Sequence, residues 1–289
     1  MGAVTGNLQA ARGTRPFLRW AGGKQKIVAK ITTLLPPEVH AATYREPFVG
    51  AGSLFFALRP KQAHLSDLNA HLINCYVQVR DHPSEVASLL VRHGSRNCSD
   101  YYYEQRAKYN DDITSSPAQA ARFIYLNRTC FNGIFRVNKQ GNFNVPYGRK
   151  ERPLLPTDQE LKAVGAALEG AELQVADFCT AMESAERGDF LYLDPPYPPL
   201  NGTSYFTHYT VDRFSEEHQR ALAAGVYELD RKGCRFLMSN ADVPLVRELY
   251  QGFNLHELSV TRFITCSKKR HRVSELVITN YLRGGRSRD

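Results

Sequence analysis

The sequence predicts an α/β protein built on a mostly parallel β-sheet. Short apolar stretches typical of strands alternate with segments whose apolar residues follow the period of a helix. The first strand runs into a glycine-rich turn, Val49-Gly50-Ala51-Gly52, and the second strand ends at an acidic residue, Asp67. Strands followed by turns and helices in this order are typical of sheets whose strand ends line a ligand crevice.

The N-terminal part of the chain is expected to form a helix followed by one β–α–β unit. Residues 24–35 have apolar side chains at helical spacing, and Pro36-Pro37 ends that pattern. We expect a strand at 43–47, a helix at 53–58 and a second strand at 63–66.

Residues 68–156 differ from this pattern and are expected to form an inserted helical domain. Helical patterns rich in Tyr, Arg and His run to about Arg128. The segments 135–138 and 142–145 flank Lys139-Gln140-Gly141. This arrangement predicts a basic β-hairpin with Gly141 in its turn.

The alternation of helices and strands resumes after Pro156. Thr157 and Glu160 have the spacing of a capping box, which predicts a helix ending near Leu168. Further elements are expected as strands at 172–176, 190–193, 235–239, 255–260 and 275–282 and as a helix at 215–231. The last two strands have no helix between them and should therefore pair antiparallel. The core domain then comprises residues 17–67 and 157–282, with disordered ends at 1–16 and 283–289.

Charge and composition favour a polyanionic partner such as nucleic acid. The 37 Lys and Arg residues outnumber the 29 Asp and Glu residues, for a formal net charge of +8 and a pI of about 9.2. The six cysteines include no C-x-x-C pair, which argues against a zinc site or a disulfide framework. No apolar run approaches the roughly 18 residues of a membrane span, and no signal peptide precedes the core. We expect a cytoplasmic, monomeric protein with no bound metal and no membrane association.

The first motif with chemical meaning is the glycine-rich turn together with Asp67. Small residues let a nucleoside-containing ligand approach the backbone, and a carboxylate at the end of the second strand can accept hydrogen bonds from both ribose hydroxyls. A nicotinamide dinucleotide fingerprint would require a third glycine where this chain has Phe55. A tight structural turn, with Asp67 as a helix N-cap, is the alternative interpretation.

The second motif is Asp194-Pro195-Pro196-Tyr197, directly after the apolar strand at 190–193. The two prolines fix the backbone φ and remove two donors, leaving carbonyl groups that point outward. If Asp194 and the Pro195 carbonyl each accept one N–H of an exocyclic aromatic amine, the amine nitrogen can direct its lone pair at an electrophilic methyl group. If the amine belongs to a nucleic-acid base, Tyr197 can stack on that base, which must leave the duplex to reach this position. The chain contains no Pro-Cys dipeptide for thiolate attack on cytosine carbon.

With the segment Phe17-Leu18-Arg19-Trp20-Ala21-Gly22-Gly23-Lys24, these motifs resemble the Dam-like DNA adenine-N6 methyltransferases of the D12 class, in the alpha arrangement. The resemblance covers residues 17 to about 282. It implies a Rossmann-like sheet of the S-adenosylmethionine-dependent methyltransferase fold, with 68–156 as the target-recognition domain. It also implies methyl transfer to adenine catalysed by Asp194, Pro195, Pro196 and Tyr197. The cofactor-binding residues that it implies are Trp20, Lys24, Pro47, Phe48, Asp67, Asp177, Phe178 and Asp194.

The stretch from Asn127 to Arg149 is similar to the recognition hairpin of family members that modify adenine within GATC in double-stranded DNA. The resemblance implies that Arg136 reads a guanine, as Arg commonly does in the major groove. It also implies that Phe131 and Ile134 wedge into the base stack and that Asn132 contacts bases or backbone. By the same resemblance Arg149 holds a phosphate and Arg19 touches a guanine. Phe131 and Arg19 stand where relatives often have Tyr and Lys, and Lys150 stands where Tyr is frequent. The basic segment 268–276 resembles a part of the family that lies near DNA, although a solvated loop before a strand fits as well.

Three other functions share some of these features. Methylation of cytosine N4, or of an RNA base, would use the same pocket, because the chemistry serves any exocyclic amine. A DNA-binding protein without catalysis is disfavoured by the intact Asp194 to Tyr197 motif, and a nicotinamide oxidoreductase by Phe55. Both a stand-alone methylase and the methylase of a restriction–modification pair fit the sequence.

Overall fold

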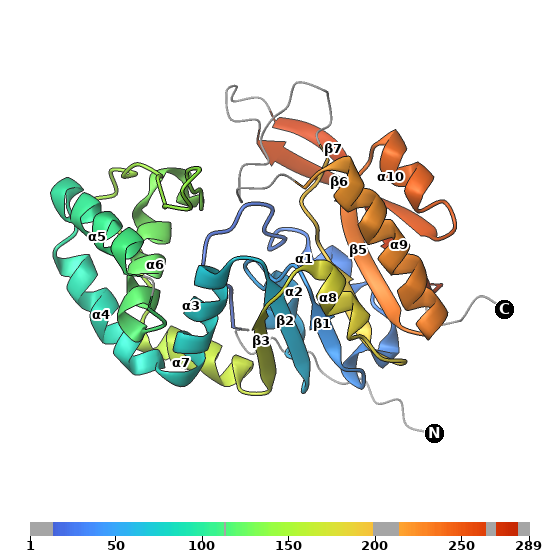
Figure 1. Cartoon of the computed structure of the whole chain (residues 1–289), viewed down its shortest axis with the longest axis horizontal. Coiled ribbons are helices and arrows are strands. Elements are labelled where there is room, and N and C mark those ends of the chain that lie inside the picture. Colours follow the sequence, from blue (N-terminus) through green and yellow to red (C-terminus); the bar gives the residue numbers. More distant parts are fainter. Residues whose placement is uncertain (1–13, 113, 199–213, 264–269, 283–289) are drawn as a thin grey trace.

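The structure is a computed structural model that describes residues 14–112, 114–198, 214–263 and 270–282. A central twisted sheet occupies one half of the molecule, and a group of helices stands beside its β3 edge (Figure 1). The ends expected to be disordered, apart from residues 14–16, and Lys268-Lys269 of the basic segment lie outside the described residues.

The sheet contains seven strands in the order β3-β2-β1-β4-β5-β7-β6. Their bounds are Tyr44–Glu46 (β1), Ala63–Asp67 (β2), Ala171–Val175 (β3), Phe190–Leu193 (β4), Arg235–Ala241 (β5), Asn254–Phe263 (β6) and Arg270–Thr279 (β7). The first five strands are parallel, whereas β7 pairs antiparallel with both β5 and β6. The mostly parallel, Rossmann-like sheet and the antiparallel final pair predicted from the sequence are therefore confirmed.

The strand order reverses between β1 and β4, and a ligand crevice is expected at that reversal. Strands β1, β2 and β3 extend the sheet in one direction and β4 and β5 in the other. Ligands of open α/β sheets bind outside the carboxyl ends of the strands at such a reversal. Glu46 ends β1, and Asp194 directly follows β4, so the two strand ends bring both sequence motifs to this crevice.

Two hydrophobic clusters cover the two faces of the sheet. Along β4, Phe190 and Tyr192 belong to one cluster, and Leu191 and Leu193 belong to the other. All four side chains are buried, which explains why this strand is a continuous apolar run rather than an alternating one. The helices of the core are α1 (Val28–Thr32), η1 (Pro37–His40), α2 (Ser53–Leu58), α8 (Phe178–Glu183), α9 (Glu216–Lys232) and α10 (Pro244–Leu249).

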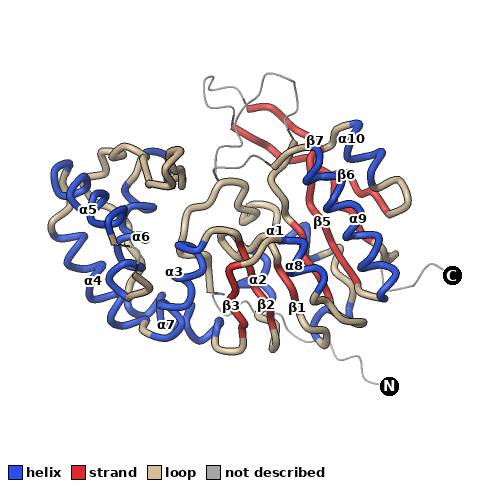
Figure 2. The backbone as a smooth tube through the Cα atoms, in the orientation of Figure 1, coloured by secondary structure: helices blue, strands red, loops and turns tan. Residues whose placement is uncertain are grey.

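The inserted segment is helical, as expected. It contains α3 (Ala70–Asp81), α4 (Pro83–Ser95), α5 (Ser99–Asp111) and α6 (Pro117–Thr129), which Figure 2 shows beside the strands. Helix α7 (Asp158–Leu168) has the predicted capping box between Thr157 and Glu160, and it packs against α3 and α4 before the chain enters β3.

The predicted β-hairpin is present, but its two arms are too short to form regular strands. In place of two regular strands the structure has one antiparallel bridge, Val137 to Phe143, and a short 3-10 turn, η2 (Phe131–Gly133), ahead of it. Asn110 of α5 accepts a hydrogen bond from the backbone N–H of Phe143 and donates one to its carbonyl, at 2.9 and 3.1 Å. Asn110 thus binds the outer edge of the second arm, while backbone bonds from Asn138 N to Asn142 O at 2.8 Å and from Asn144 N to Arg136 O at 3.1 Å join the two arms. Gly141 does lie in the turn, with φ +83°.

The observed helices also differ from those expected in three places. The α-helix expected over 24–35 is confined to α1, because the chain turns tightly before it and a 3-10 turn follows Pro36. Helices α8 and α10 were not predicted. Each has six residues, which is too short to show a helical period.

Candidate active site

The carboxylate of Asp194 lies at the centre of a buried polar cluster. Lys24 Nζ donates to Asp194 Oδ1 at 2.6 Å and to Oδ2 at 2.7 Å, and Ser239 Oγ donates to Oδ1 at 2.7 Å. Lys24 is only 6% exposed and also donates to the Gly22 carbonyl at 2.9 Å. A carboxylate has about four acceptor sites. Three are occupied by these donors, which leaves one on Oδ2 for a hydrogen bond from a substrate.

The ring of Tyr197 is fixed beside this carboxylate. Its hydroxyl donates to Glu275 Oε2 on β7 at 3.1 Å, and Lys24 Nζ lies 4.7 Å from its ring centroid. Burial, followed by the negative charges of Asp194 and Glu275, raises the pKa of Tyr197 well above its ordinary value. The phenol therefore stays neutral, and its ring can serve as an apolar stacking surface.

The backbone between Asp194 and Tyr197 is held from α9. Pro195 is buried and Pro196 exposed. The carbonyl of Pro196 accepts a hydrogen bond from Gln219 Nε2 at 3.1 Å. The four predicted catalytic residues thus form one segment whose side chains and main chain both have partners.

The glycine-rich turn after β1 packs closely on Trp20. Gly50 and Gly52 have φ of +45° and +62°, in the left-handed region that favours glycine. A Cβ at Gly50 would lie 2.8 Å from Trp20 Cδ1, so a larger residue would displace the indole. Trp20 stacks on Phe135 of the inserted domain, with ring centroids 5.7 Å apart and planes 19° apart. The indole therefore contacts both the glycine-rich turn and the inserted helical domain.

Asp67 closes the other side of this turn. Its two oxygens accept hydrogen bonds from the backbone N–H groups of Gly50 and Asn69, at 3.1 and 3.0 Å. Burial raises the pKa of Asp67 to about 6. The alternative of Asp67 as the N-cap of α3 is wrong, because Asn69 caps that helix by accepting from Leu72 N. The carboxylate thus has acceptor capacity left at the strand end.

The remaining residues expected at the cofactor site form an aromatic group beside the crevice. Phe48 stacks on Phe178 with centroids 5.5 Å apart, and Phe214 contacts both rings. Asp177 is exposed and caps α8, accepting from Thr180 N at 2.9 Å, and this bond lowers its pKa.

Four further polar residues near Asp194 were not predicted from the sequence: Ser239, Glu275, Gln219 and Glu46. Glu46 is 2% exposed and accepts a hydrogen bond from Tyr44 at 2.7 Å, and burial raises its pKa well above the ordinary value. Its place directly before Pro47 in the glycine-rich motif was the available signal. Pro47 itself is buried where the chain leaves β1.

Arg19 lies against residues 127–134, where DNA contacts are expected and which we call the recognition turn, although 108 residues separate it from Asn127 in the sequence. Asn127 Oδ1 accepts from Arg19 N at 2.8 Å, and Asn127 Nδ2 donates to Arg19 O at 2.7 Å. A Cβ at Gly133 would lie 2.4 Å from Arg19 Cδ, so this glycine makes room for the arginine. The exposed Arg19 side chain is therefore positioned beside the residues expected to contact DNA.

The recognition turn presents an exposed aromatic ring. Phe131 is 54% exposed, and Asn132 and Gly133 after it have positive φ. Ile134 is half-buried. An exposed apolar side chain on a sharply turned backbone is the form that a wedge between base steps requires.

The two arginines of the bridged segment are placed differently. Arg136 is half-buried, and Asn144 accepts from its Nε at 2.8 Å. Arg149 is exposed, with φ +52°, just beyond the segment.

Three cations gather at the base of this turn. Arg128 Nε donates to Leu154 O, and Lys150 Nζ donates to Arg128 O, both at 2.8 Å. Burial, and next the positive charge of Arg19, lowers the pKa of Arg128 and of Lys150. The mutual repulsion of these cations would be relieved by an anion such as a phosphate.

Residues 19–24 connect the recognition turn, the glycine-rich turn and the catalytic segment. Arg19 contacts Gly133, Trp20 contacts Gly50, and Lys24 contacts Asp194. These three contacts therefore join the turn at Gly133, the glycine-rich turn and Asp194.

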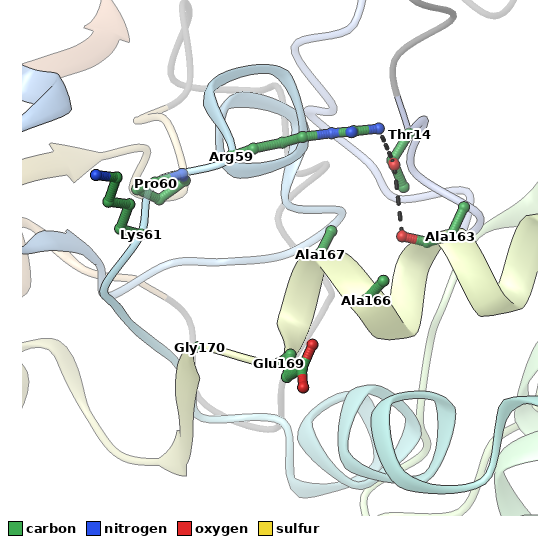
Figure 3. Close-up of a pocket in the computed structure, with 9 residues that line it drawn as sticks. All are labelled: Thr14, Arg59, Pro60, Lys61, Ala163, Ala166, Ala167, Glu169 and Gly170. Carbon is green, nitrogen blue, oxygen red and sulfur yellow. Dashed lines mark hydrogen bonds between the residues drawn. The ribbon is translucent and has the colours of Figure 1, made fainter.

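A shallow pocket of about 540 Å³ lies elsewhere (Figure 3). Arg59, Pro60 and Lys61 line it ahead of β2, and Gly170 lines it directly ahead of β3. These are the amino ends of parallel strands, at the edge of the sheet opposite the ligand crevice. Its position gives it no role in the chemistry at Asp194.

The described residues contain no group of three or more His, Cys, Asp or Glu side chains arranged to hold a metal ion. In the same part of the chain, none of the helices combines the length and apolar composition needed to cross a bilayer.

Comparison with known proteins identifies the family of the chain. The family model described as D12 class N6 adenine-specific DNA methyltransferase matches residues 20–264. The type II methyltransferase M1.LlaDCHI of Lactococcus lactis subsp. cremoris is 40% identical over 273 residues, covering 92% of this chain and 95% of that protein. The type II methyltransferase M.MjaIII of Methanocaldococcus jannaschii is 37% identical, covering 92% and 99%. The DNA adenine methylase of Escherichia coli strain K12 is 36% identical, covering 91% and 94%. The chain belongs to the D12 class of DNA methyltransferases that modify N6 of adenine.

Proposed function

We propose that this DNA adenine methyltransferase acts within GATC, uses S-adenosylmethionine as methyl donor and receives its target adenine flipped out of the duplex. The observation that carries the proposal is the Asp194 cluster, in which one acceptor site of Oδ2 remains beside a fixed aromatic ring.

The residues around the glycine-rich turn fit S-adenosylmethionine. Asp67 offers acceptor capacity for the ribose hydroxyls, and the stacked pair Phe48 and Phe178 offers an aromatic surface for the adenine. Pro47 and Asp177 directly precede these two aromatic residues in the chain, Trp20 packs against Gly50, and Lys24 binds the Gly22 carbonyl and Asp194. When bound, this cofactor supplies the electrophilic methyl group.

The target amine is oriented by the catalytic segment. Asp194 Oδ2 accepts one N–H and the Pro195 carbonyl accepts the other, which draws the nitrogen toward tetrahedral geometry and aims its lone pair. Lys24 and Ser239 hold the carboxylate in place through three hydrogen bonds. Tyr197 stacks on the base, which compensates part of the few kcal/mol needed to unstack and unpair it.

Site selection is assigned to the recognition turn and the segment after it. Arg136 reads a guanine through its guanidinium, Arg19 contacts a second guanine, and Phe131 with Ile134 fills the gap in the stack. Asn132 contacts bases or backbone, and Arg149 holds phosphate. The similarity of residues 127–149 to family members that act on GATC supports this assignment, as does the exposure of Phe131, Arg19 and Arg149.

One experiment tests both base and site. The chain is expressed in a host that lacks DNA methylation, methylated positions are mapped across the genome, and the hydrolysed DNA and RNA are weighed by mass spectrometry. N6-methyladenine confined to GATC in DNA is the expected result. Methylation at another sequence would overturn the site assignment, while N4-methylcytosine or a methylated RNA base would overturn the pocket assignment.

A further inference from the structure

We propose that Gln219 and Asn240 form a positioning relay that fixes the carbonyl groups of the catalytic segment for methyl transfer. Gln219 Nε2 on α9 donates to Pro196 O at 3.1 Å. Asn240 Nδ2 on β5 donates to Gln219 Oε1 at 3.2 Å, and the backbone N–H of Ala241 donates to Asn240 Oδ1 at 2.8 Å. The relay thus runs from the sheet, through two amides, to the catalytic segment.

The orientation of both amides follows from the first bond of the relay. A backbone N–H can only donate, so the oxygen of Asn240 must face Ala241 and its NH₂ group must face Gln219. The oxygen of Gln219 then faces Asn240, and its NH₂ group faces Pro196. Because the backbone N–H of Ala241 can only donate, the orientation of both amides is fixed, and Gln219 presents a donor to the Pro196 carbonyl.

The burial of the two amides marks them as a specific feature. Gln219 is 1% exposed and Asn240 is fully buried. Gln219 occupies the same buried face of α9 as Leu222, Val226 and Leu229, where an apolar side chain would continue the pattern. A buried amide at such a position is stabilising only when its hydrogen bonds are made, and here they end at the catalytic segment.

The covalent geometry of the prolines carries the constraint to the next carbonyl. The ring of Pro196 fixes its φ, so only ψ at this residue can rotate the peptide plane of Pro196 relative to that of Pro195. The bond from Gln219 holds the Pro196 plane. It thereby limits the direction of the Pro195 carbonyl to rotation about that one torsion, and this carbonyl, under the proposed function on which this inference rests, accepts one N–H of the target amine.

The first test replaces Gln219 with Met, which keeps the length of the side chain and removes the donor. We expect the single-turnover methylation rate to fall by about 10- to 100-fold, the scale of a misplacement of about 1 Å at a reacting centre. The dissociation constants for S-adenosylmethionine and for duplex DNA should not change, because neither is bound by the relay. A rate equal to that of the wild type would overturn the proposal.

The second test, Asn240→Asp, reverses the relay while keeping its shape. A carboxylate can only accept, so the Gln219 amide would turn its NH₂ group toward the new carboxylate and present its oxygen to the Pro196 carbonyl. A similar loss of rate is expected, and the double variant should be no slower than the slower single variant, because both changes break one relay. Additive losses would overturn the proposal. Should Gln219→Met fail to fold, an unchanged rate for Asn240→Asp would overturn it equally.

Gln119 provides a matched control. It is 2% exposed on α6, and its Nε2 donates to the backbone carbonyls of Tyr109, at 2.8 Å, and Asp112. Gln119→Met should lower the melting temperature and leave the methylation rate unchanged, and an equal loss of rate there would show that any buried glutamine has this effect. A wild-type enzyme that does not methylate adenine would instead refute the proposed function, which keeps the two failures distinct.

Discussion

Replacing Asp194 with Asn tests the proposed acceptor directly, because the two side chains have almost the same shape. From the sequence alone Asp194→Asn is expected to be milder than Asp194→Ala, since an amide oxygen still accepts hydrogen bonds. The contacts of Lys24 reverse this expectation. Its ammonium lies 2.6 and 2.7 Å from the two oxygens, so an amide NH₂ at either position faces another donor. Ser239, at 2.7 Å from Oδ1, favours the amide oxygen there, which places NH₂ where the target amine should donate.

The size of the effect follows from the contacts that change. Losing an acceptor aimed at a developing charge costs about 2.7 to 4 kcal/mol, or roughly 10²- to 10³-fold in kcat. Lys24, whose side chain is 7% exposed, would also lose its charged partner. Removing one partner of a buried pair costs about 3 to 5 kcal/mol of stability. Because the Asp194 side chain is 18% exposed, we expect a value near the lower end.

A double variant separates catalysis from stability. Lys24→Met with Asp194→Asn removes both charges, and replacing a buried ion pair by neutral groups is often nearly neutral. The pair of changes should restore most of the free energy of unfolding without restoring activity. Single-turnover methylation and thermal unfolding would be measured on the single and double variants. If Asp194→Asn keeps more than about a tenth of the wild-type rate, the acceptor role of Oδ2 is wrong.

Four further predictions concern the cofactor and the DNA. The affinity for S-adenosylmethionine should fall as the pH drops through about 6, because burial raises the pKa of Asp67 to about 6 and only the ionised carboxylate offers all its acceptor sites; calorimetry over a pH series that shows constant affinity would remove Asp67 from the ribose site. The same raised pKa makes ionisation of Asp67 unfavourable in the folded state. The stability that Asp67 contributes is therefore fully present below its unfolded pKa of about 3.9 and is lost as the pH rises through about 6. Urea unfolding of the wild type and of Asp67→Asn over a pH series would measure this loss. Arg136→Ala should weaken binding to the recognition site by about 1 to 3 kcal/mol and relax the preference at one base. Arg149→Ala should instead weaken binding to all sequences and lower the salt dependence of binding by about one phosphate contact. Identical rate profiles over singly substituted GATC sites for wild type and Arg136→Ala would contradict base reading. Phe131→Ser should leave the melting temperature unchanged, because the ring is 54% exposed, while lowering the fluorescence of 2-aminopurine placed at the target position, and an unchanged signal would show that this ring does not support base flipping.

The sheet could be predicted from the sequence because each strand has a local signal. The run Phe190 to Leu193 is buried on both faces, so it is uniformly apolar, and the turn after β1 needs left-handed residues, so it contains Gly50 and Gly52. For the hairpin after Phe131, the turn at Gly141 could be predicted in the same way, but the contact at the outer edge of its second arm could not. Its second half pairs with Asn110, a side chain from a helix distant in sequence, and no local pattern records such a contact.

The candidate site shows the same division between local and long-range information. Asp194 and Lys24 were both expected at the site, but 170 residues separate them, and taken alone Lys24 is an ordinary solvated residue at a helix start. Ser239, Glu275 and Gln219 carry even less local signal, because a single polar residue on a buried strand or helix face has many structural explanations. What identifies them is the shared target: all three reach the segment from Asp194 to Tyr197, from β5, β7 and α9. A polar residue in a buried pattern therefore acquires a functional meaning only when the fold shows which group shares its hydrogen bond.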